Sequence, residues 1–172
     1  MNPFSVLGLP DSFDVDEKAL EKTHRELSRA LHPDRYTNAS ATERRAALER
    51  AVQVNEAFRV VRDPLTRAEA LFARLGVATG EDREPKASPA LLMDVLEKRE
   101  ALSDAKDAKD LSAVAGLRAE AEREEARAIA ALASAFHEPE TVAEKLHLLG
   151  ELRFFRRFLD EVSAVEESFD AS

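Results

Sequence analysis

Apolar side chains recur three or four positions apart through most of this chain, in stretches that prolines and glycines separate. One such stretch carries Leu148, Leu152, Phe155, Leu159 and Val162, at steps of 4, 3, 4 and 3 residues. This spacing lines apolar side chains along one side of a helix. The chain is also rich in Ala, Leu, Glu and Arg, and only 5 of its 172 residues are glycine and 7 are proline. The sequence therefore predicts an all-α fold.

The composition excludes several classes of protein. The chain has no cysteine, which excludes disulfides, thiol catalysis and cysteine-ligated metal centres. No apolar run approaches the roughly 18 residues of a membrane span. The N-terminus lacks the basic and apolar regions of a signal peptide. A cytoplasmic protein that does not enter a membrane is therefore expected.

The net charge of −9 is unevenly distributed. Residues 1–75 hold 12 basic and 12 acidic side chains, whereas residues 76–172 hold 13 and 22. Because phosphate contacts need clustered Lys and Arg, this chain is a poor candidate for binding nucleic acid. The contrast between the halves predicts two different functional surfaces.

Residues 1–76 are predicted to form four helices. Asp14, with Glu17 three residues later, fits a capping box for the second helix. Asp63 and Pro64 fit the N-cap and first position of the fourth, which Gly76 ends. The predicted bounds are 3–8, 14–31, 41–62 and 64–76.

The second and third helices are predicted to pair as an antiparallel hairpin through their apolar sides. On the second helix this side consists of Leu20, His24, Leu27 and Leu31, with His24 semi-buried at its edge. On the third helix the predicted buried side consists of Leu48, Val52, Asn55 and Phe58.

The turn of the hairpin begins with the tripeptide His32-Pro33-Asp34. Pro33 has no N–H and biases His32 away from the helical conformation, so the second helix should end before it. His32 and Asp34 then project as a switchable donor or acceptor and a fixed anion. No nucleophile or complete metal-ligand set accompanies them. The motif therefore favours docking to a partner, and no catalytic residue, metal or cofactor is expected.

Four cations follow one line on the side of the second helix opposite its apolar residues: Lys18, Lys22, Arg25 and Arg29. No anion lies on this line. The sequence leaves two interpretations open, a docking surface and an ordinary solvated face.

Residues 77–87, "VATGEDREPKA", have the composition of a linker, with glycine, proline and charge but no periodicity. Three helices are predicted after it, near residues 89–106, 110–136 and 140–168. Short joints imply antiparallel neighbours, so residues 88–172 should form a three-helix bundle.

Several segments together resemble a J-domain, the module of DnaJ-type co-chaperones: "PFSVLGLP", the basic helix, "HPDRY" and "NEAFRVVRDPLTRAEALF". The run Asp-Pro-Leu-x-Arg-Ala-Glu-x-Leu, followed by a linker and an acidic bundle, is similar to the HscB family of iron–sulfur cluster assembly. The resemblance covers nearly the whole chain. It implies an L-shaped protein with a J-domain at 1–76, a linker at 77–87 and a client-binding bundle at 88–172.

The resemblance implies that the J-domain binds a DnaK/HscA-type chaperone and stimulates its ATPase. His32, Pro33 and Asp34 match the family signature directly, whereas the four cations match its basic helix face only in character. The chain would then change another enzyme's rate and have no chemistry of its own. A monomer is expected.

The resemblance also implies that the bundle binds an IscU-type scaffold protein. At about 100° per residue, Leu92, Leu96 and Met93 fall about 100°, 140° and 200° away from the core position Leu91. Phe154 falls about 100° away from the apolar line of the last helix. An exposed apolar patch is one interpretation, and a bundle that buries wide arcs is the other.

The residues expected to bind the scaffold are Leu92, Met93, Leu96, Glu97, Glu100, Asp104 and Phe154, with Phe155 as an alternative to Phe154. Two other functions also fit the sequence. One is a J-domain co-chaperone for a different client, and the other is a purely structural helical adaptor in which the turn motif is accidental.

Overall fold

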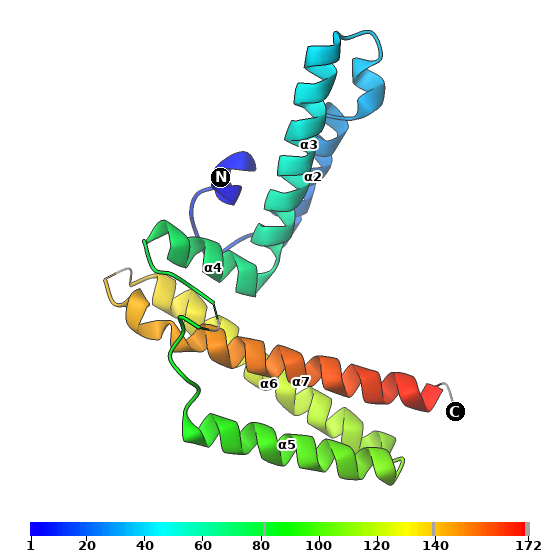
Figure 1. The fold of residues 1–172 in the computed structure, drawn as a ribbon, viewed down its shortest axis with the longest axis vertical. Coiled ribbons are helices and arrows are strands. Elements are labelled where there is room, and N and C mark those ends of the chain that lie inside the picture. The colour runs from blue at the N-terminus through cyan, green and yellow to red at the C-terminus, as the bar shows by residue number, and fades with distance from the viewer. Residues whose placement is uncertain (81, 139, 171–172) are drawn as a thin grey trace. The chain divides into compact units, whose positions relative to one another are not determined.

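The protein is described by a computed structural model of residues 1–172, except residues 81, 139, 171 and 172. The described elements are all helical, which confirms the all-α prediction (Figure 1). They are α1 (Pro3–Val6), α2 (Glu17–Ala30), the 3-10 turn η1 (Pro33–Tyr36), α3 (Ala41–Arg62), α4 (Pro64–Arg74), α5 (Pro89–Asp107), α6 (Leu111–Phe136), the 3-10 turn η2 (Val142–Lys145) and α7 (His147–Asp170). The chain divides into two compact units, Met1–Val77 and Ala78–Ser172.

Helix ends in the N-terminal unit follow local capping chemistry. Ser40 and Glu43 form a capping box that starts α3, and Asp63 accepts hydrogen bonds from the first turn of α4. Gly76 follows α4 with φ +75°, the left-handed conformation that glycine adopts without strain. The predicted cap of α2 was wrong by two residues, because Asp16 rather than Asp14 accepts from the backbone N–H groups of that helix.

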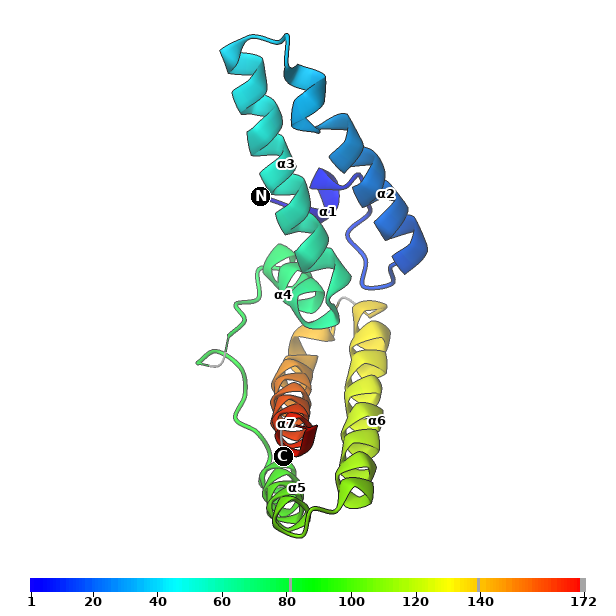
Figure 2. The same cartoon turned by 90° about the vertical axis from the view of Figure 1, so that its right-hand side faces the viewer.

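α2 and α3 form the predicted antiparallel hairpin (Figure 2). The predicted buried side of α3 was wrong except at Phe58, which is half-buried and stacks on His24. Leu48 and Val52 are each 61% exposed, and Asn55 is exposed as well. The side of α3 that packs in the core consists of Ala47, Val54, Ala57 and Val61. Small residues at two of these positions let neighbouring helices approach α3 closely.

Arg67 joins α3, α4 and the segment before α2. Its guanidinium is buried and donates to the carbonyl oxygens of Val61 at 2.7 Å, Phe13 at 2.7 Å and Arg62 at 3.0 Å. It also lies 5.2 Å from the centroid of the Phe13 ring. Burial lowers the pKa of Arg67, although nearby carboxylates partly oppose this effect. The arginine of the Asp-Pro-Leu-x-Arg run is thus a structural residue.

The C-terminal unit is a bundle of α5, α6 and α7 (Figure 1). Its core cluster consists of Leu102, Ala105, Val114, Ala121, Phe158, Val162 and Val165. Lys98 of α5 is also buried, and it bonds to Asp94 one turn earlier and to Glu120 of α6 at 3.0 Å. The α7 helix begins at His147 rather than near residue 140, since η2 and the buried Val142 precede it.

The segment before α5 is attached to the bundle. The Glu84 side chain is only 4% exposed and pairs with Arg153 of α7 at 2.7 Å. Glu84 also accepts a hydrogen bond from the Gly80 N–H at 3.1 Å. Part of the sequence assigned to a linker is therefore anchored on α7. Within the described ranges, no helix is both long enough and apolar enough to span a membrane.

Candidate functional site

The His32-Pro33-Asp34 motif lies at the exposed end of the α2–α3 hairpin. α2 ends at Ala30, close to the predicted end, and His32 is the N-cap of η1 with Pro33 as its first residue. The Asp34 N–H donates to Nδ1 of His32 at 3.4 Å, and the Asp34 carboxylate lies 3.5 Å from the same nitrogen. The Tyr36 hydroxyl donates to the Ala30 carbonyl at 3.4 Å and ties the turn back to α2.

Both polar side chains of this motif are open to a partner. The exposed fractions are 60% for the His32 side chain and 86% for Asp34. Because η1 and Pro33 fix the backbone, the two groups are held out with little conformational freedom left to lose on docking.

The four cations of the second helix, Lys18, Lys22, Arg25 and Arg29, are exposed on α2. Two of them have acidic neighbours one turn away: Lys22 lies 4.0 Å from Glu26, and Arg25 lies 3.8 Å from Glu21. Contacts this long between exposed groups contribute little stability. The cations therefore remain available to a partner's carboxylates.

A second exposed surface lies on α5 of the other unit. Leu92 is 44% exposed, Met93 56% and Leu96 53%, whereas Val95 of the same helix is 3% exposed. The helix thus has one apolar side in the core and another facing solvent. The acidic residues expected beside this patch are exposed too: Glu97, Glu100 and Asp104.

The two adjacent phenylalanines of α7 differ in accessibility. Phe155 is 5% exposed and belongs to the core, while Phe154 is half-buried. The Arg157 guanidinium lies 5.4 Å from the centroid of the Phe154 ring, a cation–π contact. Of the two, Phe154 is the ring that a partner can reach.

A salt bridge that the sequence did not indicate joins the helices carrying these residues. Arg99 of α5 bonds to both carboxylate oxygens of Glu161 on α7, at 2.9 and 2.6 Å. The two residues are 62 positions apart, and nothing local in the sequence pairs them. The contact holds α5 against α7 about two turns from Leu92 and Phe154.

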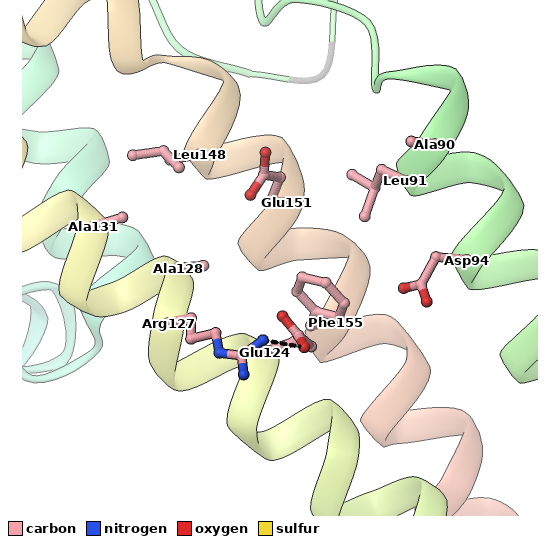
Figure 3. Close-up of a pocket in the computed structure, with 10 residues that line it drawn as sticks. All are labelled: Ala90, Leu91, Asp94, Glu124, Arg127, Ala128, Ala131, Leu148, Glu151 and Phe155. Carbon is pink, nitrogen blue, oxygen red and sulfur yellow. Dashed lines mark hydrogen bonds and ion pairs between the residues drawn. The ribbon is translucent and has the colours of Figure 1, made fainter.

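A cleft of about 490 Å³ opens between the three helices of the bundle (Figure 3). Phe155 and Leu148 form its apolar floor, and Asp94, Glu151 and the paired Glu124 and Arg127 border it. Of the residues expected to bind a scaffold, Phe155, the alternative to Phe154, lines it, and the other seven do not. Among the residues whose placement is described, no group of three or more His, Cys, Asp or Glu side chains could hold a metal ion.

Comparison with known proteins places both units. Residues 2–70 match the model of the DnaJ domain, and residues 87–163 match that of the HSCB C-terminal oligomerisation domain. The chain is 37% identical over 163 residues to the "Co-chaperone protein HscB homolog" of Bordetella avium, covering 95% of this chain and 96% of that protein. The chain belongs to the HscB family of co-chaperones.

Other HscB relatives agree. The homolog of Pasteurella multocida is 33% identical over 171 residues, with 97% of each chain covered. The structure of HscB from Vibrio cholerae superposes with a TM-score of 0.81 at 29% identity, covering 98% of this chain and 99% of that one. Human HscB shares the fold, with a TM-score of 0.87 at 22% identity over 96% of this chain and 82% of its own.

HscB membership has direct consequences for function. Relatives across the whole chain are named co-chaperones, and the J-domain of a co-chaperone implies an Hsp70-type partner. Membership also supports a role in iron–sulfur cluster assembly.

Proposed function

We propose that this chain stimulates the ATPase of a DnaK/HscA-type chaperone and delivers an IscU-type scaffold protein to it. The chain performs no chemistry of its own and acts as a monomer. The observation that carries the proposal is the presence, in an HscB-family chain, of two exposed surfaces on separate units: the His32 turn and the apolar patch of α5.

The chaperone would dock on the first surface. His32 and Asp34 provide its polar contacts, which Pro33 helps to fix, and the exposed cations of α2 attract carboxylates on the partner. An Hsp70-type partner fits because the turn lies in the segment that matches the DnaJ domain.

The scaffold would dock on the second surface. Exposed apolar side chains bordered by charged groups are typical of protein interfaces. The apolar contacts in this assignment are Leu92, Met93, Leu96 and Phe154, and the acidic border consists of Glu97, Glu100 and Asp104. Because one chain binds both partners, the scaffold meets the chaperone at a raised effective concentration.

Steady-state ATPase activity of the chaperone, measured with the scaffold present, tests the first half of the proposal. Wild-type protein should stimulate hydrolysis, and His32→Gln should abolish stimulation. His147→Gln is the matched control, because His147 is exposed on the other unit. Stimulation that survives His32→Gln would refute the assignment of this turn.

Binding of the purified scaffold, measured by calorimetry, tests the second half. Leu92→Ala, Met93→Ala and Phe154→Ala should each weaken binding about tenfold, since each removes an apolar contact from the interface. Leu111→Ala is the control, because Leu111 is 61% exposed at the start of α6. If wild-type protein stimulates the ATPase but does not bind the scaffold, the client is a different protein.

A further inference from the structure

Two large apolar side chains of the N-terminal unit lie in solvent although the sequence pattern predicts them to be buried. Leu48 and Val52, one turn apart on α3, are each 61% exposed. Val54 and Ala57 beside them are 1% and 0% exposed, so α3 has a complete buried side without this pair. An exposed apolar pair that packing does not need points to an interface.

The position of the pair follows from the contact between α2 and α3. Nε2 of His24 bonds to Oδ1 of Asn55 at 2.9 Å, and the ring of His24 stacks on Phe58 with 4.0 Å between centroids. At about 100° per residue, Leu48 lies about 20° and Val52 about 60° around α3 from Asn55, away from the buried side. Leu48 is also two turns nearer the His32 turn than Asn55 is.

The basic residues of α2 lie on the same side of this contact. Arg25 is about 100° and Arg29 about 140° around α2 from His24, again away from the buried side. Since the helices are antiparallel, the same sense of rotation away from the His24–Asn55 contact leads on both helices to the same outer face of the hairpin. Leu48 and Val52 therefore share that face with the cations of α2.

The opposite side of α3 is covered. Arg50 donates to the carbonyl oxygen of Val6 at the end of α1 at 3.2 Å, and α1 packs along α3 (Figure 2). The outer face thus remains the open side of the hairpin. On α3 the exposed Arg45 and Arg59 border the apolar pair, but the exposed Glu49 and Glu56 lie on the same side, and Glu56 pairs with Arg59 at 2.7 Å.

We propose that Leu48 and Val52 are the apolar centre of the chaperone-docking face, and that the cations of α2 form its charged border. The occupant is the ATPase chaperone of the proposed function, on which this inference rests. The surface of the chaperone that this face would contact is an apolar patch bordered by carboxylates. Continuity with the His32 turn and with the α2 cations, which can attract carboxylates on the chaperone, favours this occupant over a second copy of the chain.

The test measures chaperone ATPase as a function of co-chaperone concentration for the double variant Leu48→Ser/Val52→Thr. The half-saturating concentration should rise about tenfold, because two apolar contacts are lost from the interface. Maximal stimulation should stay unchanged, because His32 is intact. Leu111→Ser, at the same 61% exposure on α6, should leave the half-saturating concentration as in wild type.

Thermal unfolding of the double variant should match wild type, since both side chains already lie in solvent. If the double variant unfolds at a lower temperature, the single variant Val52→Thr, which keeps the shape of the side chain, is used instead. Its half-saturating concentration should rise about threefold.

Each other outcome overturns the inference in a recognisable way. A wild-type half-saturating concentration for the variant, with wild-type protein active, refutes it and leaves the proposed function intact. A change confined to self-association in sedimentation assigns the face to a second copy, and a change confined to scaffold binding assigns it to the client. If wild-type protein fails to stimulate the chaperone, the proposed function itself is wrong and this inference fails with it.

Discussion

Among single side chains outside the apolar core, Arg67 is the one whose removal should destabilise the J-domain unit most. In Arg67→Ala, three carbonyl oxygens lose the guanidinium that satisfies them. Those of Phe13 and Val61 belong to residues 4% and 0% exposed, so water cannot easily replace the lost donor. The carbonyl of Arg62, an exposed residue, can turn to solvent.

The expected cost follows from the two buried acceptors. A buried acceptor left without a partner costs about 1–3 kcal/mol, so Arg67→Ala should destabilise the unit by about 4 kcal/mol. A unit of this size is stable by only about 4–12 kcal/mol in total. Arg67→Lys keeps the charge but not the planar fork that reaches three acceptors, and should cost about 2–3 kcal/mol.

The chain offers a probe for this unit alone. It contains one tyrosine, Tyr36, and no tryptophan, so tyrosine fluorescence in a urea titration reports the N-terminal unit. With a slope of about 1 kcal/mol per M, Arg67→Ala should lower the midpoint by several molar and Arg67→Lys by about half as much.

Arg59→Ala is the matched control for Arg67. The Arg59 side chain is 76% exposed and pairs with Glu56 one turn away, so its loss should cost less than about 0.5 kcal/mol. If Arg67→Ala shifts the midpoint no more than Arg59→Ala does, the three carbonyl contacts do not stabilise the unit and this reasoning is wrong.

Three further predictions concern the C-terminal unit. Hydrogen bonds from Arg118 lower the pKa of Glu166 below its ordinary value of 4.5. The stability that this pair contributes is therefore present above the unfolded pKa and is lost as pH falls through the lower folded pKa. When wild type and Glu166→Gln are titrated with acid and followed by circular dichroism, the variant should lack this loss of stability. Burial would lower the pKa of Lys98, but its bonds to two carboxylates outweigh burial and raise it. The stability that this charge contributes is therefore fully present below the unfolded pKa and is lost as pH rises through the raised folded pKa. Alkaline titration of Lys98→Met, followed by circular dichroism at 222 nm, should lack this step. Glu84→Gln removes the salt bridge with Arg153 of α7 and should release the segment before α5. Trypsin should then cleave at the exposed Arg83 severalfold faster. An unchanged cleavage rate would show that the salt bridge does not hold that segment.

Most helix ends could be predicted from the sequence because capping is local. Asp63 and Pro64 at the start of α4, and Gly76 after it, act within a few residues of the backbone groups that they serve. Asp14 and Asp16 are both good caps, and the carbonyl of the neighbouring Phe13 is held by an arginine 54 residues away. Local patterns do not contain that contact.

The buried side of α3 could not be predicted from the spacing of large apolar residues. Leu48, Val52 and Phe58 recur at helical spacing, but the core selects Ala47 and Ala57, which let helices pack closely. One signal was present: the predicted side included Asn55, a polar residue that a core position disfavours.

The candidate sites divide in the same way. The exposure of His32 follows from proline chemistry, which is readable along one segment. Helix angles set the α5 patch apart from the core side of that helix, but they left open whether the bundle buries it. The Arg99–Glu161 bridge and the exposure of Leu48 depend on how separate helices pack, which single-segment patterns do not encode.

The buried guanidinium of Arg67 also bears on how long a folded J-domain unit persists. The His24–Asn55 bond closes a loop of 31 residues, whereas the Arg67–Phe13 bond joins residues 54 apart. Longer loops are costlier to close, so the helical hairpin should form before the Arg67 contacts do. Interactions made after the folding transition state slow unfolding and leave the folding rate nearly unchanged. Arg67 should therefore slow unfolding of the unit and prolong the time over which the His32 turn stays folded and accessible to a partner.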